Sequence, residues 1–344
     1  MTLIQPTRRA VPLLALLAGL AVSACGSSSS HSTSTGSTSA TTSSAAAPPP
    51  AVAELGPAEK PQAAQFPAAS GKTLQQLASG VQQAAQLGAA TGTFTPGTRR
   101  FAFALTTKAG AFVYAPTALY IARSPNRPAQ GPYLAPADPL GVPAADRSRQ
   151  NAGPGGIQAI YAANLKLPSK GTYTVLALSR TSGGLVGAPG EIAVAASSPI
   201  PDVGQRPPAI ATDTPASAHG NTALLTTRVP PDDMNAVSFK DVLGKRPIAL
   251  LFSTPQLCIS KVCGPVTDIA VNLEHRFGHK IAFIHEEVYA DNQPSHGLRS
   301  QLKAFHLQTE PWLFTIDRHG RIAARLEGSF GLNAFTAALQ AALR

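Results

Sequence analysis

The chain has 344 residues and a formal net charge of +10, yet only 13% of its residues are charged. The excess arises because acidic residues are scarce, and no run of lysines and arginines and no basic face interleaved with aromatic residues occurs. The composition therefore lacks the usual signature of nucleic-acid binding. Once low-complexity stretches are set aside, the length allows two domains.

The first 25 residues have the pattern of an export signal. A start containing Arg8 and Arg9 precedes an apolar core over residues 10–22, which is shorter than the roughly 20 residues that span a bilayer. The segment ends in the letters VSAC, and this ending resembles the bacterial lipobox, whose cysteine is lipidated and becomes the mature N-terminus. The resemblance implies a lipid anchor at Cys25, on the outer face of the cell membrane. Cleavage of an ordinary signal peptide near Ala24 is the alternative.

Residues 26–71 are rich in serine, threonine, alanine and proline. Such a composition buries too little apolar surface to offset the entropy of ordering, so we expect a disordered tether. Leucines and alanines near helical spacing over residues 73–87 then predict a short helix.

Together with this helix, residues 72–200 are expected to form an all-β, sandwich-like domain of the immunoglobulin-like kind. Short apolar runs separated by turn signals are typical of such sandwiches. We expect a loop over residues 124–156, which are rich in proline, alanine and glycine, and a proline-rich linker over residues 201–228. The predicted strands cover residues 101–105, 112–114, 118–121, 157–167, 172–178, 185–186 and 191–195.

Residues 229–344 alternate between strand and helix patterns. Two βα units, a β-hairpin and a closing helix predict a mixed sheet with helices on both faces. The predicted strands cover residues 248–254, 280–285, 312–316 and 321–326. The predicted helices cover residues 265–277, 298–305 and 332–343.

Two cysteines, Cys258 and Cys263, lie between the first of these strands and its helix. With Cys25 assigned to the lipid, they remain as a pair in an oxidising compartment. A cysteine at this position is expected to be reactive, because a helix N-terminus stabilises a thiolate. Paired cysteines after the first strand, together with Pro311 ahead of a later strand, resemble the thioredoxin fold of membrane-anchored thiol–disulfide oxidoreductases.

The resemblance implies a cis peptide bond at Pro311, facing the cysteines, beside which a substrate chain docks. It also implies thiol–disulfide exchange with a protein thiol or disulfide and a redox partner, without a dissociable cofactor or a metal. The expected catalytic residues are Cys258, Cys263 and Pro311. Glu310 and Trp312 are expected to contact the substrate, and packing of Trp312 in the core is the alternative.

The cysteine spacing departs from that family, because its usual C-x-x-C is C-x4-C here. Residues five apart in a regular helix have Cα atoms about 8–9 Å apart, beyond the roughly 7 Å limit for a disulfide. Cys258 must therefore lie outside the helix, which Pro265 is expected to begin after Cys263. Cys258 is favoured as the attacking thiolate, with Lys261 as a nearby cation. Cys263, as the start of a C-G-P motif, is the alternative.

Three other functions fit part of the pattern. A peroxiredoxin-like thiol peroxidase shares the C-x4-C spacing, but Thr254 lies four residues ahead of Cys258 instead of three. A Sco-like copper protein would bind Cu(I) or Zn²⁺ through two thiolates and a histidine, for which His306 is the candidate. An inert disulfide in a non-catalytic thioredoxin-fold module is the third.

Overall fold

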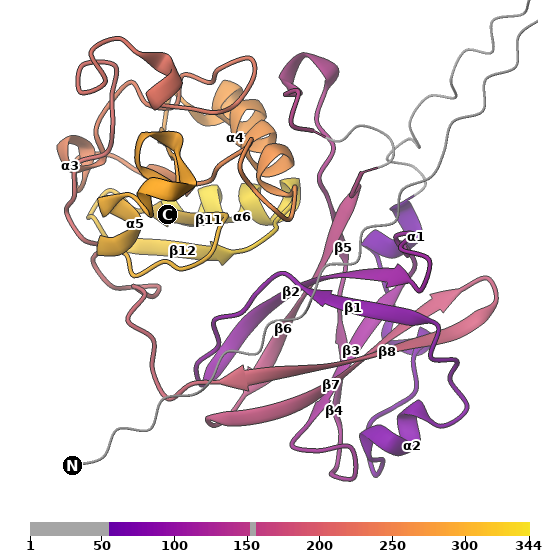
Figure 1. The fold of residues 1–344 in the computed structure, drawn as a ribbon. Helices are drawn as coiled ribbons and strands as arrows, with labels where there is room; N and C mark the ends of the chain where they lie inside the picture. The colour runs from indigo at the N-terminus through magenta and orange to yellow at the C-terminus, as the bar shows by residue number, and fades with distance from the viewer. Residues whose placement is uncertain (1–54, 152–155) are drawn as a thin grey trace, which may run out of the picture. The chain divides into compact units, whose positions relative to one another are not determined.

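The computed structural model describes residues 55–151 and 156–344. Its strands form three four-stranded sheets, with the spatial orders β1-β2-β6-β5, β4-β3-β7-β8 and β10-β9-β11-β12 (Figure 1). The described part of the chain is therefore rich in β structure. The first two sheets consist of β1 Ala85–Ala89, β2 Gly97–Thr107, β3 Thr117–Ala122, β4 Gln130–Leu134, β5 Ala137–Pro139, β6 Ala159–Leu167, β7 Gly171–Thr181 and β8 Gly184–Val194.

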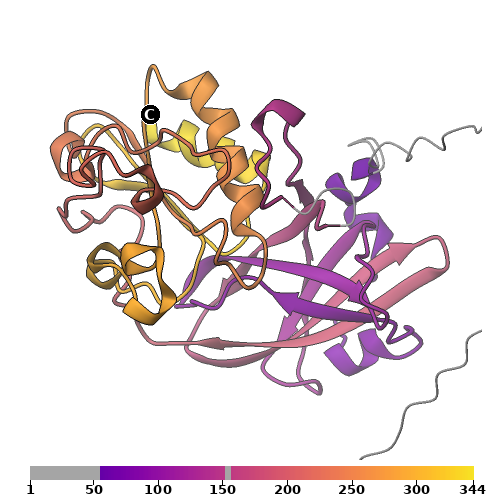
Figure 2. The same cartoon turned by 45° about the horizontal axis from the view of Figure 1, so that its top comes forward.

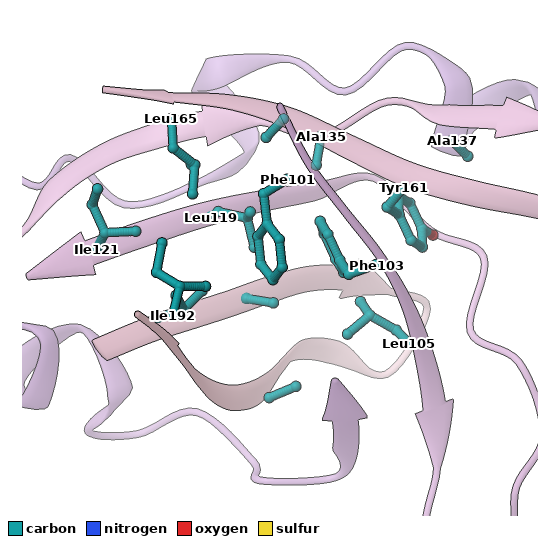
Figure 3. Packing of buried hydrophobic residues seen from close by; sticks show 14 of the residues in the cluster. Phe101, Phe103, Leu105, Leu119, Ile121, Ala135, Ala137, Tyr161, Leu165 and Ile192 are labelled. Atoms are coloured by element: carbon teal, nitrogen blue, oxygen red, sulfur yellow. The ribbon is translucent and has the colours of Figure 1, made fainter. Parts of the chain in front are cut away.

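These two antiparallel sheets, called the β-domain below, enclose a shared core. On β2, Phe101 stacks on Phe103 with ring centroids 5.4 Å apart, and Phe103 stacks on Tyr161 of β6 at 5.5 Å. Figure 3 shows these rings in the same packed layer as Leu119 of β3 and Ile192 of β8. Alternate residues of each strand enter this layer, as two packed sheets require. The predicted β-rich region is confirmed.

Several element boundaries in the β-domain differ from the prediction. The helix expected over residues 73–87 is only α2 (Leu74–Ala78), because the chain turns at Gly80, whose φ is 80°, and then enters β1. The expected loop over residues 124–156 contains β4 and β5. Residues 112–114 form no strand, and the two expected strands at residues 185–195 are the single strand β8.

Residues 55–71 are packed, although we expected them in the disordered tether. Leu55 and Ala58, from the start of helix α1 (Gly56–Glu59), enter the core between the sheets. Phe66 and Ala69 cover the outer face of the β4-β3-β7-β8 sheet. These apolar side chains supply the burial that the serine-rich composition lacks. The export signal, Cys25 and residues 26–54 lie outside the described residues.

The third sheet confirms the predicted mixed arrangement with helices on both faces. Strand β9 (Ile248–Phe252) is parallel to β10 (Ala282–Glu286) and antiparallel to β11 (Trp312–Ile316), which pairs with β12 (Ile322–Glu327). One face packs on α4 (Cys263–Phe277) and α6 (Leu332–Ala342), which lie side by side in Figures 1 and 2. The other face packs on α3 (Phe239–Val242) and α5 (Ser300–Ala304).

The expected linker over residues 201–228 is also packed, along the third sheet. Ile210 joins the core on the α5 face of that sheet. The Thr212 hydroxyl accepts a 2.8 Å hydrogen bond from the backbone N–H of Phe239. Thr227 donates from its hydroxyl to the Glu287 carboxylate at 2.7 Å. Prolines limit regular structure here, but these contacts hold the segment in place.

Candidate functional site

The cysteine loop, residues 253–262, connects β9 to α4. Helix α4 begins at Cys263, two residues earlier than expected, and Pro265 occupies its third position, where a backbone N–H has no intrahelical partner. Cys258 lies in a turn ahead of the helix, as the spacing argument requires. Lys261 has a φ of 58°, which turns the loop towards the helix start. Both cysteines are free thiols.

Two thiols and a carboxylate lie together at this helix N-terminus. The sulfur atoms of Cys258 and Cys263 and a carboxylate oxygen of Glu310 are within 4.8 Å of one another. The peptide bond between Glu310 and Pro311 is cis, as the resemblance implies. The Pro311 carbonyl accepts a 2.8 Å hydrogen bond from the N–H of Gly328, after β12. The fold thus brings four of the expected site residues together, although they come from two distant segments.

Hydrogen bonds lower the pKa of the Cys258 thiol to about 6. The largest contribution is the hydrogen bond from the Cys263 thiol; burial opposes it, and the Ser260 hydroxyl, 3.3 Å from the sulfur, adds to it. The backbone N–H groups of Cys263 and Val262 add further lowering. This is the stabilisation expected of a thiolate at a helix N-terminus. The charge of Lys261 is not among these causes.

The other two groups have shifts in the opposite direction. Burial raises the pKa of the Cys263 thiol well above its usual value, and the hydrogen bond to Cys258 and the Glu310 charge raise it further. Burial, followed by the neighbouring Cys258, also raises the pKa of the Glu310 carboxyl. The arrangement therefore holds Cys258 as the thiolate and Cys263 as the protonated thiol.

The Trp312 side chain is packed in the core of the third sheet. Its side chain has no exposed surface, and its ring stacks on Phe314 with centroids 5.8 Å apart. Its indole N–H donates to the Thr309 hydroxyl at 3.0 Å, which satisfies its polar group. Packing in the core, the alternative for Trp312, is the arrangement that the structure has, because the first residue of β11 points into the α5 face of the sheet.

We expect the reactivity of Cys258 to depend on pH and on its partner. With a pKa of about 6, about 90% of Cys258 is thiolate at pH 7, so alkylation by iodoacetamide should rise through pH 6 and then level off. Replacing Cys263 by alanine removes the main hydrogen bond and should shift this profile to higher pH by 1 to 2 units, estimated from the cost of a hydrogen bond to a charged group. Mass spectrometry of the alkylated peptide measures both profiles.

The serine variant is the matched control for that experiment. Cys263→Ser keeps a hydroxyl donor at the same position, so its profile should lie between those of the wild type and Cys263→Ala. Identical profiles for all three proteins would show that Cys263 does not set the Cys258 pKa. Cys258 is 7% exposed and Cys263 is fully buried, so the reagent reaches Cys258 first.

The β-domain is docked on the third sheet by buried polar contacts. Asp138 of β5 accepts hydrogen bonds of 2.8–3.0 Å from the backbone N–H groups of Gly331, Asn333 and Ala334 at the start of α6. Glu327 of β12 accepts from the backbone N–H groups that follow β1, at residues 92 and 93. These contacts fix the first strands of the β-domain beside the cysteine loop.

Two glycines allow the backbones to approach closely at this contact. A Cβ at Gly328 would meet the carbonyl oxygen of Ala90 at 1.6 Å, and the φ of Gly328 is 69°. A Cβ at Gly264, in the first turn of α4, would meet the carbonyl oxygen of Gln150 at 2.8 Å. Both positions therefore require glycine for steric reasons.

A cavity of about 740 Å³ opens between the two parts. Gly88, Ala104 and Ile160 line it from the β-domain, and Val262 and Glu310 line it from the cysteine site. Its walls are mostly apolar or glycine, and its size lies in the range of ligand-binding cavities. Because Glu310 lies in its wall, the cavity extends to the group that adjoins both sulfur atoms.

No protein-family model matches the chain, and no similar protein was found among the curated ones. Within residues 55–151 and 156–344, no helix is long and apolar enough to cross a membrane.

Sequence reasoning placed the cysteines and Pro311 but did not predict how the β-domain reaches them. It assigned Glu310 to substrate contact and did not predict that its carboxylate adjoins both thiols. Ile259, next to Cys258, is 94% exposed, and its sequence signal is a large apolar residue directly beside the first cysteine of the pair. The residues of β1 that line the cavity have no comparable signal, because glycine and alanine reveal no chemistry.

Proposed function

We propose that this protein is a thioredoxin-like thiol–disulfide oxidoreductase. The observation that supports it is the pair of free thiols within 4.8 Å of each other at a helix N-terminus, next to the cis Glu310–Pro311 bond. The strand order β10-β9-β11-β12, with two helices on one face and shorter ones on the other, is consistent with such a fold. We also propose that the β-domain is an immunoglobulin-like sandwich.

In the reducing direction, the Cys258 thiolate attacks one sulfur of a substrate disulfide. The substrate S–S bond breaks, a mixed disulfide forms at Cys258, and the leaving sulfur takes up a proton. Cys263 then loses its proton and attacks the Cys258 sulfur, which releases the second substrate thiol. Two electrons pass from the Cys258–Cys263 pair to the substrate, and a thiol-bearing redox partner restores the pair. The oxidising direction follows the same steps in reverse.

Glu310 has a place in this cycle as the proton acceptor for Cys263. The Cys263 thiol is buried and its pKa is raised, so it needs a base before it can attack. The Glu310 carboxylate lies within 4.8 Å, near enough to take the proton through one water or after a small side-chain rotation. Its own raised pKa favours holding that proton.

A disulfide-reduction assay with a model peptide tests the function. The dithiol protein should reduce a peptide disulfide with stoichiometric formation of the Cys258–Cys263 bond, which peptide mapping detects. Glu310→Gln should slow the second step, so the mixed disulfide persists longer than in the wild type. Full activity in variants that lack either cysteine would contradict the proposal.

A metal site is the second candidate, because the same three groups form a donor set. Two thiolates and a carboxylate suit Zn²⁺ better than Cu(I), which prefers sulfur ligands. Among the described residues, the ligand group consists of Cys258, Cys263 and Glu310, so His306 is not part of it. Stoichiometric retention of Zn²⁺ by the reduced protein, without disulfide reduction, would favour this candidate.

The peroxidase candidate receives less support from the site. The Thr254 side chain is fully buried, and its hydroxyl has no hydrogen-bond partner among the described residues. A peroxide would have to reach that buried hydroxyl to be oriented by it. Rapid oxidation of Cys258 by hydrogen peroxide would restore this candidate.

The proposed location is the outer face of the cell membrane, through a lipid on Cys25. The support is the VSAC ending of the export signal and the serine-rich stretch that follows it. An oxidising compartment is also where a disulfide pair is maintained. Mass analysis of the mature N-terminal peptide distinguishes a lipidated cysteine from an ordinary cleavage near Ala24.

A further inference from the structure

The β-domain contributes directly to the surroundings of the thiol pair. One wall of the 740 Å³ cavity is formed by residues of β1 and β2, among them Gly88 and Ala104. The opposite wall includes Val262 and Pro265 at the start of α4, and Glu310. A ligand in this cavity therefore touches both parts of the molecule and the carboxylate that adjoins the sulfur atoms.

One strand of this wall lies at the end of its sheet and offers contacts to an extended chain. Strand β1 lies at the edge of its sheet and pairs with β2 on one side. Edge strands present backbone N–H and C=O groups that an added strand can pair with. Gly88 and Ala89 of β1 are exposed, and a Cβ built on Gly88 meets no atom within 4 Å. Because a Cβ points out of the face of a sheet, the face of β1 is open where it lines the cavity.

The cysteine loop offers a second apolar contact outside the cavity. Ile259 follows Cys258 directly and is 94% exposed, by far the most exposed large apolar side chain of the described residues. A single exposed apolar side chain is common on protein surfaces, so the place of Ile259 directly after Cys258, and not its exposure alone, makes it a contact for a partner. A small molecule held within the cavity leaves Ile259 in water, whereas a polypeptide segment across the loop covers both contacts.

We propose that the β-domain and the cysteine loop together bind an extended, apolar polypeptide segment that carries the reacting cysteine. This proposal rests on the thiol–disulfide exchange proposed above and names its substrate class. Apolar side chains of the segment enter the cavity on one side of the reacting sulfur and cover Ile259 on the other. Such segments are exposed in proteins that have not yet folded.

Two peptides of equal length test the proposal, each holding its cysteine as a mixed disulfide with 5-thio-2-nitrobenzoate. One peptide has leucine and valine around the cysteine, and the other has serine and aspartate. We expect kcat/KM for the apolar peptide to exceed that for the polar one by about 10-fold or more, the scale of a few buried methylene groups. Release of the coloured thiol measures both rates.

Two variants then locate the contact. Gly88→Phe fills open space at the cavity wall, and Ile259→Ser removes the exposed apolar side chain. Each should reduce the preference for the apolar peptide to about 3-fold or less. The matched controls are Gly141→Phe, where a Cβ also meets no atom within 4 Å, and Val203→Ser, which is 56% exposed. Neither control residue lines the cavity, so both should keep the full preference.

The outcomes separate this proposal from the function on which it rests. A wild-type protein that fails to react even with the small disulfide 5,5′-dithiobis(2-nitrobenzoate) overturns the exchange function itself. A protein that reduces the small disulfide but shows equal kcat/KM for both peptides overturns the substrate proposal alone. The same holds if Ile259→Ser keeps the full preference, since a side chain so exposed is removed without disturbing the fold.

Discussion

Replacing Cys263 by serine is expected to trap the protein on its substrate, whereas replacing Cys258 by serine abolishes exchange. Without the second thiol, the mixed disulfide at Cys258 cannot be resolved within the protein. Without Cys258, the remaining thiol is fully buried and its pKa is raised, so the rate should fall to the background of the free peptide. Non-reducing gels and intact mass spectrometry with the disulfide peptide distinguish the two results.

The reverse assignment makes the opposite prediction, so the experiment decides between the cysteines. If Cys258→Ser is the variant that accumulates the mixed disulfide, Cys263 is the attacking thiol, as the C-G-P alignment proposes. The double variant Cys258→Ser/Cys263→Ser is the control and should form no adduct. Cys25 is the one cysteine that remains in the sequence of the double variant. Adduct formation by this variant would therefore show that the disulfide peptide reacts outside the Cys258–Cys263 pair.

Replacing Asp138 by alanine is expected to lower the free energy of unfolding by about 3–5 kcal/mol. Asp138 is 7% exposed and accepts three backbone hydrogen bonds at the start of α6, so its loss leaves three donors without their partner. The partly buried guanidinium of Arg100 also loses a nearby negative charge. Thermal unfolding should show a melting temperature lower by roughly 5–15 °C.

A second aspartate provides the matched control for this change. Asp202 pairs with Arg99 at 2.8 Å, but its side chain is 33% exposed, so Asp202→Ala should cost about 1 kcal/mol or less. Asp138→Asn, which keeps one acceptor oxygen, should fall between the two alanine variants. An unchanged melting temperature for Asp138→Ala would mean that the buried contacts between the β-domain and α6 contribute nothing to stability.

The sequence allowed much of the C-terminal part to be predicted. Strand β9 is a continuous apolar run, and β11 is one apart from Thr315, because both faces of each strand are buried. Helices α4 and α6 show helical spacing of apolar residues. The boundary error at α4 arose from a local rule, since Pro265 is tolerated throughout the first turn and not at one position alone. The element order and the cysteine loop were thus predictable from local patterns.

The expectations that differ most from the structure rested on composition alone, for the disordered tether that included residues 55–71 and for the linker over residues 201–228. Residues 55–71 and 201–228 are rich in proline and polar residues, yet a few apolar side chains such as Phe66 and Ile210 anchor them on existing sheets. Composition indicates whether a segment can bury enough apolar surface within itself to be ordered. Composition does not show whether another part of the chain provides an apolar surface on which the segment can pack.

The sequence by itself determined the export signal pattern, the β-rich and α/β regions, and the cysteine pair with Pro311 as the residues of interest. Only the tertiary structure decided that Glu310 adjoins both thiols, that Trp312 belongs to the core, and that β1 of the β-domain lines a cavity beside the site. The physical reason is separation along the sequence, because hydrophobic periodicity and turn chemistry depend on residues that are close together in the chain. The contacts of Asp138, Glu327 and Gly328 join segments more than 190 residues apart, and no local pattern encodes them.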